Sequence, residues 1–240
     1  MDPAYAAAYA DLYERHWWWR AREEFLLRRL EKRAGGRSGL RILDIGCGDA
    51  LFFDHLSEFG EVRGIEPDVR LLTDGKWQGH VHVGTLDTFT AGEPFDWLLM
   101  LDVLEHVPEP VPALRRTREL AGRGASLFLT VPAFDILWTR HDELNRHHAR
   151  YDRPGLARVL EQGGWEPVEL EYFFHWPAPL KLLVKLKEAI FPGEPEVERV
   201  PAAAINRAAL ALSRAEQRTL GRLGLPFGTS LYARCEVVRS

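Results

Sequence analysis

Two glycines bracket a cysteine at Gly46-Cys47-Gly48, directly after a short apolar run that carries Asp44. Such a run, turning through glycines into a helix, places flexible backbone where it can approach a ligand closely. Glu66 ends the next apolar run, twenty residues after Gly46. A carboxylate at that place can accept hydrogen bonds from both hydroxyls of a ribose. The pattern predicts a binding site for a ligand that contains adenosine.

Two residues near the glycines disfavour a dinucleotide as the ligand. The dinucleotide fingerprint G-x-G-x-x-G requires a glycine at its sixth position, where the pyrophosphate meets the helix N-terminus, and this chain has Leu51 there. Asp44 would repel a phosphate, whereas it could accept an ammonium group. S-adenosylmethionine has an ammonium group and no phosphate, so it is the predicted cofactor.

Alternating apolar runs and helical stretches position these residues. Strands are expected at 41–45, 62–66, 81–83, 95–101, 125–131, 165–174 and 231–238, with helices at 9–33 and 153–162. Repeated strand-helix-strand units form a parallel sheet with helices on both faces. The predicted fold class is therefore α/β, with a doubly wound, mainly parallel, seven-stranded sheet.

Three parts are expected in the chain. Residues 1–36 form an N-terminal helical lid, residues 37–175 and 228–240 form the cofactor-binding core, and residues 176–227 form a helical insertion before the last strand. The stretch between the last two strands is far longer than an ordinary hairpin connection, which is why an insertion is expected. Within it, residues 191–201 are rich in Pro and Glu and predict a linker.

Four segments in this order resemble the class I S-adenosylmethionine-dependent methyltransferases. They are Asp44-Ile45-Gly46-Cys47-Gly48, Gly64-Ile65-Glu66-Pro67-Asp68, Gly84-Thr85-Leu86-Asp87, and the run from Phe95-Asp96 to Leu101-Asp102-Val103-Leu104-Glu105-His106-Val107. The chain departs from the family pattern at two places, since Ala50 replaces a frequent third glycine and Thr85 replaces a frequent acid.

The resemblance implies a set of cofactor contacts. Thr85 and Leu86 would contact adenine, the turn after the fourth strand would lie beside the methionine moiety, and Arg20 or Arg22 on the leading helix could pair with its carboxylate. The predicted cofactor-binding residues are Asp44, Gly46, Cys47, Gly48, Glu66, Pro67, Thr85, Leu86, Leu101, Asp102 and Arg20.

Methyl transfer needs little from the protein beyond alignment, exclusion of water and, for some acceptors, removal of a proton. His106 follows the fourth strand on the cofactor side and is the candidate general base, because the ordinary pKa of histidine lies near neutrality. The alternative is that His106 only bonds nearby backbone at a helix start.

The long polar loop after the fifth strand, residues 138–151, is the expected acceptor site, since loops at the carboxyl edge carry specificity in open α/β folds. The predicted substrate residues are Trp18, Trp138, His141, His148, Arg150 and Tyr151. A metal site at His141, His147 and His148 is not expected, because their spacing matches no ligand motif and no acid pairs with them as in one.

Two further features leave alternatives open. Trp17, Trp18 and Trp19 point in different directions around a helix, so at least one should face outward, as a lid over the ligands or against the insertion. The insertion continues with leucines and three lysines at 180–187, a pattern that suits peripheral contact with an anionic membrane, a packed cap, or a homodimer face.

Composition excludes several classes. The 240 residues include 31 Lys plus Arg and 35 Asp plus Glu, so the net charge is -4, and no nucleic-acid partner is expected. Two cysteines make no disulfide framework, and neither an export signal nor a membrane-spanning run of about 18 to 20 apolar residues is evident. A cytoplasmic location is expected.

The predicted function is methyl transfer from S-adenosylmethionine to a small-molecule acceptor, with a hydroxyl oxygen of a quinone, lipid or saccharide as the preferred atom. A polar loop with several His and Arg could deprotonate a hydroxyl or hold an acidic substrate. Two alternatives remain: N-methylation of an amino sugar or similar amine, and a protein that binds the cofactor without turnover.

Overall fold

Seven strands form one sheet in the computed structural model, which describes residues 10–72, 75–191, 193 and 199–237. The order across the sheet is β3-β2-β1-β4-β5-β7-β6. In chain order the strands are β1 (Leu40–Ile45), β2 (Gly60–Glu66), β3 (Val81–Val83), β4 (Phe95–Leu101), β5 (Ala121–Pro132), β6 (Trp165–Phe173) and β7 (Ser230–Val237).

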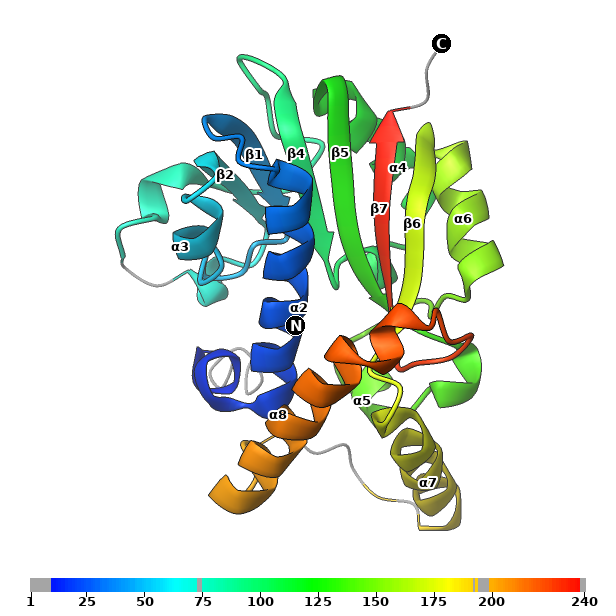
Figure 1. The fold of residues 1–240 in the computed structure, drawn as a ribbon. Coiled ribbons are helices and arrows are strands. Elements are labelled where there is room, and N and C mark those ends of the chain that lie inside the picture. Colours follow the sequence, from blue (N-terminus) through cyan, green and yellow to red (C-terminus); the bar gives the residue numbers. More distant parts are fainter. Residues whose placement is uncertain (1–9, 73–74, 192, 194–198, 238–240) are drawn as a thin grey trace. The chain divides into compact units, whose positions relative to one another are not determined.

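The four pairs β1–β2, β1–β4, β2–β3 and β4–β5 are parallel. Figure 1 shows the arrow of β7 pointing the opposite way to β4 and β5. The order grows outward on both sides from β1 and β4, as in a doubly wound sheet. The predicted fold class is confirmed.

The chain divides into two compact units. The core unit comprises Arg37–Pro132, His148–Glu171 and Leu231–Ser240, and the helical unit comprises Met1–Gly36, Ala133–His147 and Tyr172–Ser230. The helical unit thus contains both the N-terminal segment and the stretch before the last strand, which the sequence suggested as lid and insertion. It also contains the first part of the loop after β5.

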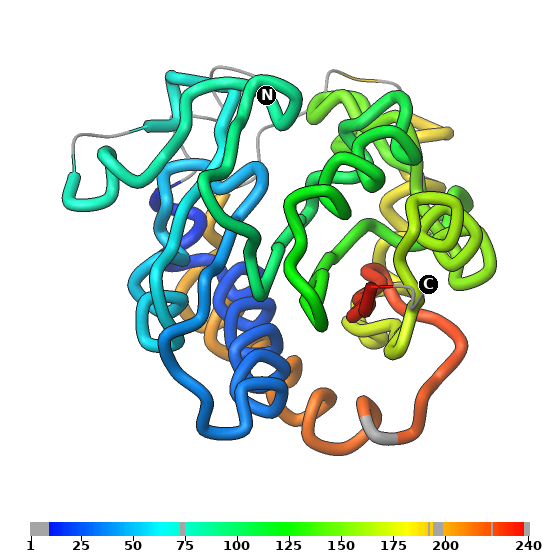
Figure 2. The backbone as a smooth tube through the Cα atoms, turned by 90° about the horizontal axis from the view of Figure 1, so that it is seen from above, coloured from blue at the N-terminus to red at the C-terminus, as the bar shows by residue number. Residues whose placement is uncertain are grey.

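Buried apolar and aromatic side chains join the sheet to the helices α4 (Pro110–Leu120) and α6 (Arg153–Gln162). Trp165 at the start of β6 is fully buried, and its indole N–H lies 3.1 Å from both the carbonyl oxygen of Leu114 and the hydroxyl of Thr117 on α4. Figures 1 and 2 show α4 and α6 beside one another, and the two helices are in contact. The core unit also contains the short helix α3 (Phe53–Leu56).

The register brings the carboxyl ends of three strands to one edge. Ile45 on β1 faces Ile65 on β2 and Met100 on β4. Gly46 therefore leaves β1 beside Glu66, the last residue of β2, and beside Leu101, the last residue of β4. The residues that the sequence pattern indicated thus lie together at the carboxyl edge of the sheet.

The leading helix is interrupted at His16, so the expected single helix over 9–33 is wrong. Residues 10–15 are helical, His16 is extended, and α2 (Trp17–Ala34) begins after it. The His16 side chain accepts a hydrogen bond from the backbone N–H of Trp18 at 3.2 Å, which caps α2. Gly35 ends the helix in the left-handed conformation, at φ 56°.

Three more helices belong to the helical unit: α5 (Arg140–Leu144), α7 (Pro177–Ile190) and α8 (Ala203–Arg218). Short 3₁₀ turns occur along the chain, namely η1 (Val69–Leu71), η2 (Gln78–His80), η3 (Leu104–His106), η4 (Asp135–Leu137) and η5 (Leu220–Arg222). The predicted linker over 191–201 falls largely outside the described residues.

The three tryptophans of α2 meet other aromatic rings, and none is largely exposed to solvent. Trp17 packs against Trp176 at the start of the predicted insertion, which is one of the two alternatives that the sequence left open. Trp17 lies 5.1 Å from Trp176 and 5.9 Å from Phe174, between ring centroids. Trp18 also contacts Phe174, at 5.7 Å, and Trp19 lies 5.9 Å from Tyr13. Aromatic residues that follow β6 thus cover the sides of α2 that the sequence left without a partner.

Candidate functional site

The glycine loop after β1 is shaped by close packing. The backbone N–H groups of Gly46 and Cys47 donate to the carbonyl oxygen of Ile65, at 2.8 and 3.2 Å. Gly46 and Gly48 have φ values of 73° and 58°, in the left-handed region that favours glycine. A Cβ on Gly46 would lie 2.6 Å from the Val103 side chain on the turn after β4. The loop therefore needs glycine for conformation and for space.

Glu66 ties this loop to the end of β2. One carboxylate oxygen accepts the backbone N–H of Gly48 at 2.9 Å, and the other accepts that of Asp68 at 2.8 Å. The residue is 5% exposed, and burial raises the pKa of its carboxyl group against the lowering by these two bonds. Each oxygen keeps a lone pair, so the carboxylate can still accept hydrogen bonds from a diol.

Asp44 and Cys47 add to the buried polar chemistry of the loop. Asp44 is 4% exposed at the carboxyl end of β1. Burial raises the pKa of the Cys47 thiol, and the charges of Asp44 and Glu66 raise it further. The thiol is therefore held neutral and its place is structural: a Cβ on Gly64 of β2 would lie 2.5 Å from its sulfur.

The third glycine of the family pattern is replaced by Ala50, and the structure shows what that position demands. Ala50 is buried and has a φ of 61°, in the left-handed region. Alanine is strained there because its Cβ approaches the backbone. The replacement is therefore less mild than the small size difference between alanine and glycine indicates.

The segment after β3 is tied to β2. The backbone N–H of Gly84 donates to the carbonyl oxygen of Glu66 at 3.1 Å. Thr85 and Thr88 form a local turn, in which the Thr88 hydroxyl oxygen lies 3.1 Å from the Thr85 amide nitrogen and 2.9 Å from its carbonyl oxygen. Thr85 is exposed and Leu86 is half-buried. Thr85 and Leu86 thus directly follow Gly84, whose backbone is hydrogen-bonded to the last residue of β2.

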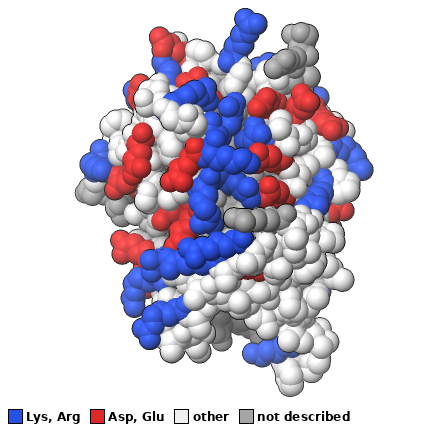
Figure 3. All heavy atoms as spheres, in the orientation of Figure 1, with Lys and Arg blue, Asp and Glu red and all other residues white. Residues whose placement is uncertain are grey.

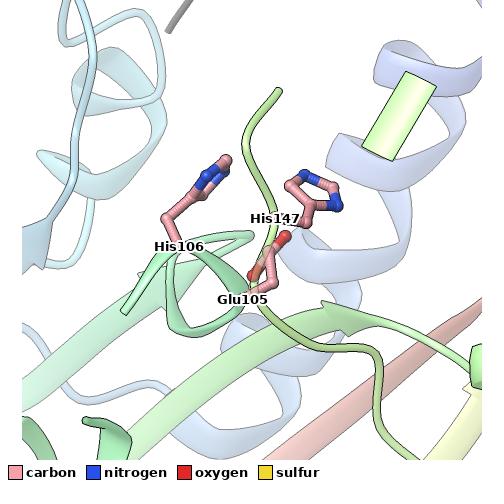
Figure 4. A group of neighbouring side chains, drawn as sticks. All are labelled: Glu105, His106 and His147. Atoms are coloured by element: carbon pink, nitrogen blue, oxygen red, sulfur yellow. The ribbon is translucent and has the colours of Figure 1, made fainter. Parts of the chain in front are cut away.

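The turn after β4 brings Asp102 and His106 to the same edge. Asp102 has a φ of 56°, and its backbone N–H lies 3.0 Å from the carbonyl oxygen and 3.1 Å from the hydroxyl oxygen of Thr130 on β5. Figure 4 shows Glu105 and His106 projecting from this turn. Glu105 is buried, at 1% exposed, whereas His106 is exposed. The His106 side chain is therefore accessible to solvent.

Comparison with known proteins identifies the family of the chain. Residues 18–170 match the family model described as a methyltransferase domain, which is well over half of the chain. The chain belongs to this methyltransferase family. Its fold matches a methyltransferase from Haloferax volcanii in complex with the Trm112 activator, with a TM-score of 0.61 and 14% identity over 99% of this chain and 96% of that one.

A second solved methyltransferase and a curated relative extend the comparison. The SAM-dependent methyltransferase of Thermotoga maritima, described as a possible histamine N-methyltransferase, has a TM-score of 0.58 and 16% identity over 98% of this chain and 96% of that one. The ubiquinone biosynthesis O-methyltransferase of Ruegeria pomeroyi is 35% identical over 162 residues, 58% of this chain and 65% of the relative. The chain thus spans slightly less than two thirds of that relative.

The predicted substrate residues of this methyltransferase fall in both units. His148, Arg150 and Tyr151 belong to the core unit, whereas Trp18, Trp138 and His141 belong to the helical unit, as does the predicted cofactor residue Arg20. In the core unit, the His148 N–H donates to the carbonyl oxygen of Glu105 at 2.7 Å, and the Tyr151 N–H donates to that of Pro132 at 3.0 Å. The chain at 148–151 is thereby held against the ends of β4 and β5.

Tyr151 and Arg150 are buried there, at 7% and 6% exposed, while His148 is exposed. Burial raises the pKa of the Tyr151 hydroxyl to about 12, with a contribution from the charge of Glu105. Tyr151 is therefore a neutral hydroxyl beside the end of β5, able to donate a hydrogen bond. It is not a candidate base near neutral pH.

In the helical unit, Arg20 is exposed on α2, and Arg22 is buried with its guanidinium 5.6 Å from the centroids of both Trp18 and Trp19. The Arg22 side chain is thus engaged in cation–π contacts. Trp138 and His141 are half-buried, and the His141 Nε2 atom lies 3.1 Å from the amide nitrogen of Asn145.

An acid–histidine pair in the loop after β5 was missed by sequence reasoning. Asp142 is fully buried, and one of its oxygens lies 2.8 Å from Nδ1 of His147. The other oxygen accepts the backbone N–H of Thr139 at 2.8 Å, which caps α5. A carboxylate at Nδ1 orients the imidazole ring of His147. An acid thus contacts one of these histidines, although not in the spacing of a metal-ligand motif, and no sequence motif marked the pair.

Proposed function

We propose that the chain transfers the methyl group of S-adenosylmethionine to a hydroxyl oxygen of a small-molecule acceptor, with a phenol of the quinone type as the first candidate. The hydrogen-bonded carboxylate of Glu66 beside two left-handed glycines carries the cofactor assignment. The curated relative from Ruegeria pomeroyi, named as a ubiquinone biosynthesis O-methyltransferase, supports the acceptor class.

The donor set fits S-adenosylmethionine. Glu66 accepts hydrogen bonds from the two ribose hydroxyls, and Asp44, buried at the end of β1, is the partner for the ammonium group. The backbone of Gly46, Cys47 and Gly48 would approach the ligand. Pro67, Thr85 and Leu86 would hold its adenine, and Leu101 and Asp102 would hold its methionine part. Bound S-adenosylmethionine supplies a methyl group already activated on a sulfonium sulfur.

The protein then has to align the acceptor oxygen and take its proton. His106, exposed on the turn after β4, is the proposed base. Its imidazole would take the hydroxyl proton as the oxygen–carbon bond forms and the carbon–sulfur bond of the sulfonium breaks, with S-adenosylhomocysteine as the leaving group. His148, Arg150 and Tyr151 at the neighbouring chain segment, with Trp18, Trp138 and His141, are the proposed acceptor contacts. The Asp142–His147 pair is a second candidate for the base, because Asp142 holds its Nδ1.

The experiment starts with calorimetric titration of the full chain by S-adenosylmethionine and S-adenosylhomocysteine, with NAD as control. Binding of the first two and none of NAD is expected. No heat from the sulfur ligands in a folded protein would overturn the cofactor assignment.

The acceptor is then tested by mass spectrometry with an isoprenoid catechol and an amino sugar. Methylated catechol together with S-adenosylhomocysteine is expected, and His106→Ala should lose about two to four orders of magnitude in turnover. If His147→Ala and Asp142→Asn lose turnover while His106→Ala keeps it, the base is His147 of the Asp142–His147 pair and not His106. Methylated amine alone would favour N-methylation, and cofactor binding without product from any acceptor would favour a binding protein.

A further inference from the structure

Helix α7 presents its charged side chains to its own unit and its apolar side chains to the outside. Lys185 donates to the carbonyl oxygen of Ile136 at 2.9 Å. The Glu188 side chain accepts the backbone N–H of Arg140 at 3.0 Å, and the carbonyl oxygen of Glu188 accepts the Arg140 guanidinium at 2.7 Å. The inward face of α7 is therefore held by polar contacts, the reverse of an ordinary surface helix.

The outward face of α7 is almost entirely apolar. Its exposed large apolar residues are Leu180, Leu182, Leu183, Val184, Leu186 and Ile190, which are 43 to 61% exposed. At 100° per residue they cover an arc of about 200°, and Lys187 is the one charged side chain within it. Scattered exposed apolar residues are common on proteins, but a continuous helical face of this width marks a contact surface.

Helix α8 in the same unit buries two apolar residues, Ala209 and Leu210, and two polar ones, Ser213 and Glu216. Its buried residues include Ser213, whose hydroxyl lies 3.0 Å from the indole nitrogen of Trp176, and Glu216, which accepts the backbone N–H of Trp176 at 2.6 Å. Its outward residues include Ile205 and Leu212, at 64% and 48% exposed, and the exposed alanines at positions 204, 208, 211 and 215. Two helices thus turn apolar faces outward.

The charge on this surface has one sign. Every residue of α7 and α8 is described, and within these two helices the only acids are Glu188, half-buried on Arg140, and Glu216, buried on Trp176. The exposed charges are Lys187, Arg207 and Arg218. Figure 3 shows the region over α7 and α8 as mainly uncharged, with scattered Lys and Arg.

We propose that α7 and α8 form a docking surface for an anionic membrane, lying in the plane of the lipid headgroups. No described helix is long and apolar enough to cross a bilayer, so the contact is peripheral. Leucines enter the boundary between headgroups and acyl chains, while the Lys187 ammonium reaches the lipid phosphates on its flexible stem. A second copy of the chain fits this surface less well, because it would bring cations together without an exposed acid on either helix to pair with them.

The test is sedimentation of the full chain with vesicles of pure phosphatidylcholine and of phosphatidylcholine with 30% phosphatidylglycerol, a composition set at roughly the anionic content of a charged leaflet. Stronger partitioning to the anionic vesicles, weakened by high salt, is expected. Leu183→Glu with Leu186→Glu should reduce partitioning about tenfold or more, and Lys187→Ala about fivefold. Equal partitioning to both vesicles, or none, would overturn the proposal.

The control for the added charge is Val168→Glu on β6, which replaces a residue of the core unit that is 48% exposed. This variant should bind vesicles as the parent does, and circular dichroism should show that all variants remain folded. Equal loss in the control would mean that net charge, and not this surface, governs binding. Concentration-dependent dimers that the leucine variants abolish, without vesicle binding, would assign the surface to a second copy.

Neither readout depends on methyl transfer. If the chain binds vesicles but not S-adenosylmethionine, the membrane proposal stands and the proposed function fails. If it binds S-adenosylmethionine but not vesicles, the proposed function stands and the membrane proposal fails.

Discussion

The backbone N–H of Gly48 lies 2.9 Å from a carboxylate oxygen of Glu66, which joins the loop after β1 to the end of β2 without a ligand. The second oxygen of Glu66 is fixed in the same way by the N–H of Asp68, at 2.8 Å. Both oxygens are therefore held at the edge where a ribose would bind. A carboxylate that is already in place loses little freedom when a ligand arrives.

Replacing Glu66 by glutamine should weaken S-adenosylmethionine binding. Because each oxygen of Glu66 accepts a backbone N–H, either orientation of the amide would set its NH₂ group against one of these donors. We expect a loss of about 1.5 to 3 kcal/mol, or roughly 10- to 150-fold in affinity, by calorimetry. Glu61→Gln, an exposed change on the same strand, is the control and should bind normally. Unchanged affinity in Glu66→Gln would refute the ribose assignment.

The same carboxylate predicts how binding depends on pH. Burial raises the pKa of Glu66, and only the ionised form accepts two hydroxyl donors while keeping its backbone bonds. Affinity should therefore fall as the pH decreases through a pKa above the ordinary value of about 4.3. Calorimetry from pH 7 down to pH 5 measures this, and Glu66→Gln, which does not titrate, should be flat over that range. If the affinity of the parent and of Glu66→Gln falls equally with decreasing pH, a titrating group other than Glu66 is responsible.

Much of the core unit could be predicted because its local signals agree with its tertiary contacts. The strands at 81–83 and 95–101 and the helix at 153–162 have the predicted bounds. In contrast, β5 begins at Ala121 instead of residue 125, since an irregularity in its pairing with β4 between Phe95 and Trp97 extends it. A register shift of this kind depends on the neighbouring strand and leaves no mark in the apolar pattern.

The helical unit was less predictable because its partners come from distant parts of the chain. The break at His16 depends on one ring nitrogen that caps α2, and the burial of Trp17 depends on Trp176. The Asp142–His147 contact needs the turn between them. The leucines of α7 were visible in the sequence, whereas their outward direction follows from the inward bonds of Lys185 and Glu188.

Alanine at Gly46 should destabilise the protein beyond the cost of its backbone conformation. Gly124 is the matched control, because its φ of 75° resembles the 73° of Gly46 while nothing lies within 4 Å of an added Cβ. Gly124→Ala should show only the left-handed strain of about 1 to 2 kcal/mol. Gly46→Ala must also displace Val103, at about 1 to 3 kcal/mol more. If urea unfolding gives the same loss of free energy for Gly46→Ala and Gly124→Ala, the loop accommodates the added Cβ at no extra cost.

Glycine at Ala50 should have the opposite effect. Ala50 is buried at a φ of 61°, so glycine relieves strain of about 1 to 2 kcal/mol while adding about 0.5 to 1 kcal/mol of backbone entropy to the unfolded chain. We expect a net gain of up to about 1 kcal/mol, or a few degrees in Tm. Ala211→Gly on the exposed face of α8 is the control and should lose about 1 kcal/mol. A loss in both variants would mean that the methyl group of Ala50 contributes more by packing than it costs in strain.

The cap at His16 should make stability depend on pH in mild acid. His16 is 2% exposed, burial lowers its pKa to about 4, and its Nδ1 accepts the N–H of Trp18, which requires the neutral ring. Between pH 6.5 and 4 the unfolded chain binds a proton that the folded chain does not, so the free energy of unfolding should fall by up to about 1.4 kcal/mol per pH unit, levelling below pH 4. His16→Asn keeps a capping acceptor and does not titrate, so its urea midpoints at pH 7, 6 and 5 should decline less steeply. Parallel declines in the two proteins would assign the pH dependence to other groups.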